Sequence, residues 1–141
     1  RPFAWISADP RHDDPALLVA SIVEALDEIE LVDPEVLLAL SNPHPAIEAV
    51  VLPRLAQSLA KRTRAFVLVI DDLHLITSQV SLELLRTVID NLPQGSQAAF
   101  ASRSEPSLHI GSLRAKRQLV EVGQAELAMT RTESAVVLAN M

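Results

Sequence analysis

The stretch Phe66-Val67-Leu68-Val69-Ile70-Asp71-Asp72 is the most informative part of this 141-residue chain for its fold class. Its first five residues form a continuous apolar run, which is typical of a strand covered on both faces of a parallel sheet. Two adjacent carboxylates end the run. Ligands of open α/β sheets bind at the carboxyl ends of the strands, so Asp71 and Asp72 lie where a binding site would form.

Strand-like and helix-like segments alternate along the rest of the chain. Short β-branched or aromatic runs predict further strands at residues 3–7, 97–102 and 119–122. Between them, apolar residues at helical spacing predict helices that begin at Pro15, at Asp33-Pro34, near Ile47, near Ser78 and near Thr130. Pro53 either kinks the third helix or marks its true start. This alternation predicts an α/β layered fold with a mainly parallel sheet.

Composition limits the class of protein. The hydrophobic content of 49% and the length suit one domain or a piece of one. The net charge is −6 and the basic residues are scattered, which argues against direct nucleic-acid binding by this segment. Cysteine is absent, and no apolar run approaches the roughly 20 residues of a membrane helix, so we expect a cytoplasmic protein without membrane contact.

The acidic pair at residues 71 and 72 has a chemical interpretation and a structural one. Two carboxylates at one sheet edge repel each other and are kept ionised most easily by a hard cation such as Mg²⁺. In a Walker B element one aspartate holds that cation, usually through water, and its neighbour orients or deprotonates the attacking water. The alternative is a solvated acidic turn, or an N-cap for the next element.

Two histidines raise the possibility of direct metal ligation. His74 follows the acidic pair, and an Asp71/Asp72/His74 cluster would suit a transition metal and a metal-dependent hydrolase. Ligands so close in sequence need a tight turn to converge, which favours a structural hydrogen bond for His74. The stretch His12-Asp13-Asp14 also resembles a metal cluster, but the Pro15 that follows favours helix capping.

Arg103 follows the predicted strand at residues 97–102 and therefore leaves the sheet at its carboxyl edge. A guanidinium at this edge can contact the γ-phosphate of a nucleotide and stabilise its charge during transfer. The alternative is an ion pair with Glu105 or Asp72. A P-loop, Gly-x-x-x-x-Gly-Lys-Ser/Thr, is missing, because neither Lys61 nor Lys116 follows a glycine.

Five stretches, in chain order, resemble signatures of the nucleotide-binding domain of STAND ATPases, and more narrowly of the maltose-activator-like, LuxR-type transcriptional regulators. They are Phe3-Ala4-Trp5-Ile6-Ser7-Ala8-Asp9, Val69-Ile70-Asp71-Asp72-Leu73-His74-Leu75-Ile76, Ala101-Ser102-Arg103-Ser104-Glu105-Pro106, Leu113-Arg114-Ala115-Lys116-Arg117-Gln118-Leu119, and Glu126-Leu127 with Met129-Thr130. The resemblance covers nearly the whole chain.

The resemblance implies a layered P-loop NTPase-like core that is incomplete, with the Walker A strand absent. Residues 1–122 would be a partial nucleotide-binding core, and residues 123–141 the start of a lid or helical domain. Asp71 would be the magnesium carboxylate, Asp72 the catalytic, water-orienting acid, and Arg103 the sensor arginine. ATP or ADP with Mg²⁺ would bind the intact parent, and we expect none bound to this chain alone.

The same resemblance implies the partners. They are other domains of the parent or further copies of the chain, an inducer bound elsewhere in the parent, and DNA reached only through a C-terminal helix-turn-helix domain absent here. It also implies that the P-loop strand lies between the Walker B strand and the Arg103 strand, so that the sheet either has a gap or closes by direct pairing of the two. The competing interpretation is a non-catalytic α/β interaction or assembly module.

Overall fold

A computed structural model describes residues 1–140. The chain divides into two compact units, Arg1–Leu108 and His109–Met141. The domain boundary expected after Val122 falls inside the second unit. Within residues 1–140, no helix is long and apolar enough to cross a membrane.

The first unit is built on a three-stranded parallel sheet in the order β1-β2-β3. The strands are β1 (Phe3–Ser7), β2 (Val67–Asp71) and β3 (Gln97–Phe100). The register joins Ser7 to Asp71 and Ile70 to Phe100. The α/β fold class with a parallel sheet is therefore confirmed, and β3 ends two residues earlier than expected.

β2 and β3 are direct neighbours. The Gln97 amide donates to the Phe66 carbonyl and the Ala101 amide to the Ile70 carbonyl, each over 3.0 Å. Of the two alternatives, a gap in the sheet or closure by direct pairing, the structure therefore has closure. Because the two strands satisfy each other's backbone groups, no gap is left for another strand.

Helices fill the connections. The β1–β2 connection contains the 3₁₀ turn η1 (Pro10–Asp13), α1 (Pro15–Asp27), α2 (Pro34–Leu40), the π-helical turn η2 (Ile47–Val51) and α3 (Leu52–Lys61). The β2–β3 connection contains the 3₁₀ turn η3 (Leu73–Leu75) and α4 (Gln79–Asp90).

The helix starts follow from capping chemistry. Asp14, Asp33 and Ser78 are the N-caps of α1, α2 and α4, and each side chain accepts a backbone amide hydrogen bond. A proline follows in the first turn of α1 and of α2, where its missing N–H costs nothing. The predicted starts near Pro15, Pro34 and Ser78 are therefore confirmed.

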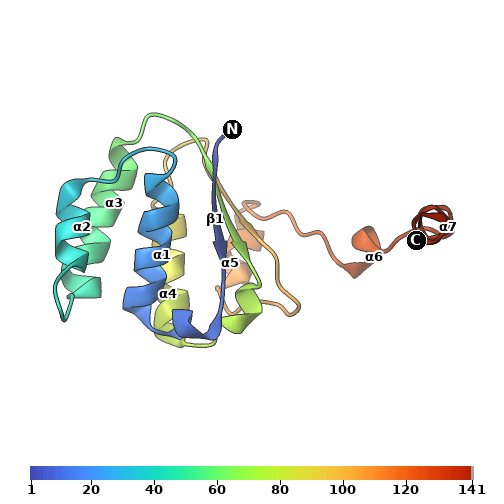
Figure 1. Cartoon of the computed structure of the whole chain (residues 1–141), viewed down its shortest axis with the longest axis horizontal. Coiled ribbons are helices and arrows are strands. Elements are labelled where there is room, and N and C mark those ends of the chain that lie inside the picture. Colours follow the sequence, from blue (N-terminus) through green and yellow to red (C-terminus); the bar gives the residue numbers. More distant parts are fainter. Residues whose placement is uncertain (141) are drawn as a thin grey trace. The chain divides into compact units, whose positions relative to one another are not determined.

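The helices of this unit cover one face of the sheet. Right-handed crossovers between strands that advance in one direction place every connecting helix on the same side. Figure 1 shows α1, α2 and α3 together to the left of β1. Ala4, Ile6, Leu68 and Ile70 are buried on that side, whereas Phe3 and Trp5 on the other side are 63% and 53% exposed. Within the first unit the expectation that β2 is covered on both faces is therefore wrong.

The second unit contains three short helices: α5 (Ile110–Ala115), α6 (Gln124–Leu127) and α7 (Arg131–Ala139). Thr130 and Glu133 form a capping box at the start of α7, near which the sequence predicts a helix to begin. The strand predicted at residues 119–122 does not form; this stretch is irregular and pairs with no strand among the described residues. An apolar run needs a neighbouring strand to satisfy its backbone, and this one has none.

Candidate functional site

The carboxyl ends of the three strands form one rim of the sheet. The Ala8 amide, just beyond β1, donates to the Asp71 carbonyl over 2.9 Å. Arg103 lies three residues beyond the end of β3, and β3 runs parallel to β2. Asp71 and the segment that carries Arg103 therefore leave the sheet at the same rim.

Asp71 is the last residue of β2 and is half-buried. Strand alternation places it on the uncovered face, together with Val67 and Val69. One carboxylate oxygen accepts the Asp72 amide over 2.9 Å. Ser7 lies opposite Asp71 in the register and accepts a 3.2 Å hydrogen bond from the Trp5 indole. Sequence reasoning did not single out Ser7, since only the register shows its position.

Asp72 has a left-handed backbone conformation, with φ 53° and ψ 34°. Aspartate tolerates this region better than most residues, but it remains strained for any residue with a Cβ. The conformation follows from a tertiary contact: the Leu73 amide donates to the Ala101 carbonyl over 2.9 Å, and the Leu73 side chain is buried, so the chain must turn at Asp72. The Asp72 side chain is 48% exposed and does not cap η3, which disfavours the N-cap alternative.

His74 lies beside the acidic pair without binding it. Its Nδ1 is 3.9 Å from the Asp72 Oδ1, which is too long for a hydrogen bond, and this buried nitrogen has no hydrogen-bond partner among the described residues. In residues 1–140, no three histidine or acidic side chains lie close enough to hold a metal ion together.

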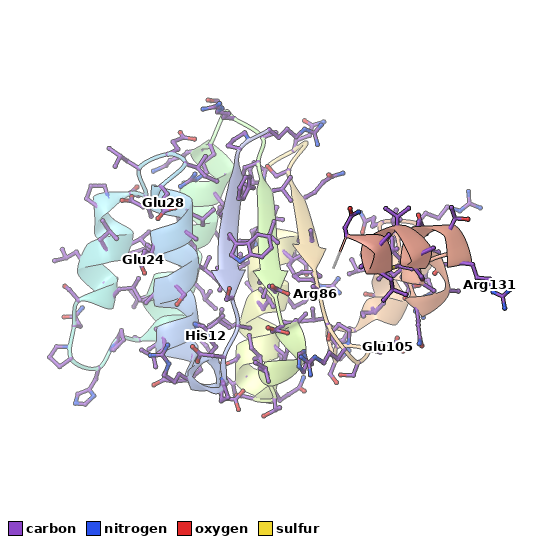
Figure 2. All side chains as sticks on the ribbon, turned by 45° about the vertical axis from the view of Figure 1, so that its right-hand side comes forward. His12, Glu24, Glu28, Arg86, Glu105 and Arg131 are labelled. Atoms are coloured by element: carbon purple, nitrogen blue, oxygen red, sulfur yellow. The ribbon has the colours of Figure 1, made fainter. Side chains whose placement is uncertain are left out.

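Arg103 lies in the exposed, irregular segment between β3 and Leu108. In the described part of the chain no ion pair joins it to Asp72 or Glu105. The segment is held at both ends: the Ser102 hydroxyl donates to the Ser104 carbonyl over 2.6 Å, and the Arg86 guanidinium donates to the Leu108 carbonyl over 3.1 Å. Arg86, which makes the second of these contacts, and Glu105, which lies in the segment, are labelled in Figure 2.

The stretch His12-Asp13-Asp14 is structural. The His12 Nδ1 accepts the Asp9 amide over 3.0 Å, and the opposite ring nitrogen lies 3.0 Å from the Ser21 hydroxyl, so the ring is buried between two partners (Figure 2). Asp14 caps α1 through the Ala16 amide. The capping interpretation is confirmed.

Asp13 connects the loop after β1 to the loop after β2. Its carboxylate accepts hydrogen bonds from the Thr77 amide, the Thr77 hydroxyl and the Ser78 amide over 2.7–2.8 Å. The Ser81 hydroxyl donates to the Asp13 carbonyl over 3.1 Å. The Ser78 amide, followed by the Thr77 hydroxyl and amide, holds the pKa of Asp13 below its ordinary value. No local pattern announces a partner 64 residues away.

These features define an α/β layered chain with a parallel sheet and an acidic pair at the carboxyl rim, compatible with part of a P-loop-type core. No protein-family model matches it. The chain is 30% identical over 133 residues to the HTH-type transcriptional regulator MalT of Cronobacter sakazakii, and 32% identical over 134 residues to the MalT of Serratia proteamaculans. Each match covers 92% of this chain.

The chain spans 14% of the length of each of these relatives. The similarity therefore supports a MalT-like relationship to one segment of a much longer regulator. The name of the relatives describes transcriptional regulation, whereas the chemistry of the acidic rim has to be argued from the residues themselves.

Proposed function

We propose that this chain is the part of an ATP-dependent transcriptional switch that supplies the magnesium carboxylate, the water-orienting acid and the γ-phosphate-sensing arginine. The observation that carries the proposal is the shared rim: Asp71 and Asp72 end β2 beside the segment of Arg103, with no strand between β2 and β3. The MalT-like relationship supports the regulatory part of the proposal.

The residues at the rim fit Mg²⁺ better than a transition metal. Mg²⁺ prefers oxygen ligands, keeps several waters, and is bound through one or two carboxylates together with substrate phosphates. Asp71 and Asp72 offer oxygen ligands of that kind, and no third acidic or histidine ligand joins them within residues 1–140. When bound, the ion neutralises charge that develops on the phosphates.

Each of the three residues then has its own role. Asp71, half-buried and fixed by the Asp72 amide, holds the ion through water. Asp72 projects from a strained turn, and its exposed carboxylate accepts a proton from the attacking water or orients it. Arg103 has no ion pair with Asp72 or Glu105 among the described residues, so its guanidinium is available to a γ-phosphate.

The sheet topology suggests where a phosphate-binding strand would add. In the described chain the outer edge of β3 pairs with no strand, and the sheet face carrying Phe3 and Trp5 lacks a helix of the first unit. In a longer protein, a P-loop strand would precede β1 in the chain and pair with the outer edge of β3. The connection from that strand to β1 would then cross the sheet in the direction opposite to the β1–β2 and β2–β3 connections. A right-handed crossover would then lay its helix over the open face.

The test uses the longer protein that contains this chain. Asp72→Asn should retain ATP binding and lose ATP turnover by about a hundredfold or more, because general acid–base groups contribute roughly 10²–10⁴ in rate. Glu24→Gln, an exposed acid on α1, is the matched control and should leave both unchanged. Unchanged turnover in Asp72→Asn would remove Asp72 from its role.

A non-catalytic assembly module is the second candidate, and the exposed Phe3 and Trp5 favour it. It predicts that Asp71→Asn and Asp72→Asn leave regulation by the longer protein intact. In the switch, Asp71→Asn weakens the binding of Mg²⁺ with ATP and Asp72→Asn stops turnover, so both changes alter regulation. DNA and the inducer would be bound by other parts of the longer protein in either case.

A further inference from the structure

A groove of about 1030 Å³ lies in the helical layer, between the N-terminus of α1, the turn η2 with the start of α3, and the first half of α4. Asp71, Asp72, His74 and Arg103 do not line it. The groove is therefore separate from the acidic rim, and an inference about it stands independently of the proposed function.

The groove combines apolar walls with acidic groups. Ala16, Leu52 and Leu84 contribute apolar surface from three different helices. Asp14, Glu48 and Glu83 add three carboxylates from three different elements, and no lysine or arginine is among the lining residues. His44 and Thr87 are the other polar side chains of the lining. A mostly apolar cavity with a few polar groups is typical of a small-molecule site.

The helix N-termini at the groove do not cancel the negative charge of its carboxylates. Each helix N-terminus carries roughly half a positive charge, which attracts acids and favours anions. Here those ends are already capped: Asp14 accepts the Ala16 amide, and Ser78 accepts the Ser81 amide. Three full negative charges exceed what the capped dipoles offset, so the groove stays negative and favours a cation.

Pro53 removes a backbone donor from the same wall. In the π-helical turn the Val51 amide donates to the Ala46 carbonyl, and the Leu52 amide donates to the Ile47 carbonyl. The next residue in this register is Pro53, which has no N–H and gives the Glu48 carbonyl no donor at that position. Glu48 thus brings its carboxylate to a wall on which Pro53 supplies no backbone donor. π-turns are frequent at functional sites.

We propose that this groove binds a small organic cation: a protonated amine or guanidinium carried on an apolar body. The apolar body would lie against Ala16, Leu52 and Leu84. The charged head would take carboxylates from Glu48 and Glu83, which stand on different helices. A ligand of this kind contributes charged hydrogen-bond donors to a lining that has no lysine or arginine.

Three matched probes test the proposal: 4-phenylbutylamine, 4-phenylbutanol and 5-phenylpentanoate have the same phenylbutyl body and carry a cationic, a neutral and an anionic head group. Each is titrated into the isotope-labelled full chain while backbone amide shifts are followed by NMR. The amine should shift amides at residues 14, 16, 46–49 and 83–87, and the affinities should fall from the amine through the alcohol to the acid.

Variants then identify the carboxylates. Glu48→Gln and Glu83→Gln should each weaken the amine by about two- to fivefold, as expected for partly exposed ion pairs, and should leave the alcohol unchanged. Glu24→Gln, an acid outside the groove and labelled in Figure 2, should change neither probe.

Three results would overturn the proposal: equal affinities for the three probes, amine-induced shifts confined to other regions such as the acidic rim, or an unchanged amine affinity in both groove variants. Because these readouts need no nucleotide, failure here leaves the ATP-switch proposal standing. Loss of turnover in Asp72→Asn likewise says nothing about the groove.

Discussion

Asp13 shows how one side chain can set the shape of a site that it does not enter. Three donors from Thr77 and Ser78 converge on its carboxylate, so the loop that follows Asp71 and Asp72 is tied to the loop that follows β1. The ionised form accepts all three hydrogen bonds, and protonation replaces one acceptor site with a donor.

This arrangement predicts a pH-dependent contribution to stability. The folded-state pKa of Asp13 is lowered from 3.8, so the contribution is present above that value and is lost as the pH falls through the folded-state pKa. Asp13→Asn, which removes one acceptor oxygen, should therefore lower the urea midpoint at neutral pH, and the difference from the wild type should shrink in acid. Urea unfolding of both proteins, from neutral pH down through the folded-state pKa, measures this difference in midpoint.

Asp14→Asn is the matched control, because asparagine caps a helix as well as aspartate does. Its urea midpoint should stay within error of the wild type at neutral pH. A difference between Asp13→Asn and the wild type that is the same at every pH would mean that the Asp13 charge is irrelevant and that only its shape matters.

For single residues, the sequence predicts the place in the fold better than the backbone conformation. The run at residues 66–70 and the acids after it placed Asp71 at the end of a parallel strand, because an apolar run followed by charge is a local signal. The left-handed backbone of Asp72 was not predictable, since it follows from the Leu73 amide donating to the Ala101 carbonyl, just beyond the end of β3. The role of Asp13 depends on a partner that is 64 residues away in sequence.

At the scale of elements, the basic residues at the end of α3 bind neighbouring elements. The Arg62 side chain is only 4% exposed and donates to the carbonyls of Leu26, in the last turn of α1, and Glu30, beyond its end, over 3.3 and 2.7 Å. The guanidinium carbon lies 5.7 Å from the Phe66 ring centroid. Burial lowers the pKa of Arg62, with Glu30 and Asp27 opposing that shift.

Arg62→Met should destabilise the chain by about 1–2 kcal/mol. Most of this loss of stability comes from the Glu30 carbonyl, which loses the Arg62 donor. The Leu26 carbonyl still accepts hydrogen bonds from the amides of Ile29 and Glu30. Relief from burying a charge offsets part of the loss, which keeps the expected value below that of a broken buried ion pair. Thermal and urea unfolding measure the change.

Arg64→Met provides the comparison, since Arg64 is exposed, and it should change stability by no more than about 0.5 kcal/mol. Equal effects of the two substitutions would show that the Arg62 contacts do not contribute to folding.

Element boundaries with a chemical cap were predictable, and those that depend on neighbours were not. Pro15, Pro34 and Thr130 mark helix starts by local chemistry, and the helices begin there. Pro53 left two alternatives, a kink or a start, and the structure combines them: a π-turn precedes it and α3 begins at Leu52. The run at residues 119–122 has strand composition, but within residues 1–140 no strand lies beside it.

For the whole molecule, the coverage of the sheet depends on strand order, which a single sequence does not reveal. The continuous apolar run of β2 predicted burial on both faces. The order β1-β2-β3 advances in one direction, so every crossover helix of the first unit lies on one face. The apolar residues on the other face, Phe3, Trp5, Val67 and Val69, are then a surface with the composition of a core.

Trp5 reports on that surface, because it is the only tryptophan in the chain and is 53% exposed. In the isolated chain its fluorescence should be red-shifted and strongly quenched by acrylamide, a neutral quencher that avoids the repulsion iodide would meet at a net charge of −6. Trp5→Phe should abolish the signal, and unfolding in urea should move the emission only slightly. Blue-shifted, protected emission would contradict the open face. If that emission moved to the red on dilution, copies of the chain would be covering Trp5.

In the longer protein the switch proposal requires protected emission at any concentration, since the helix after the P-loop would cover Trp5 within one chain.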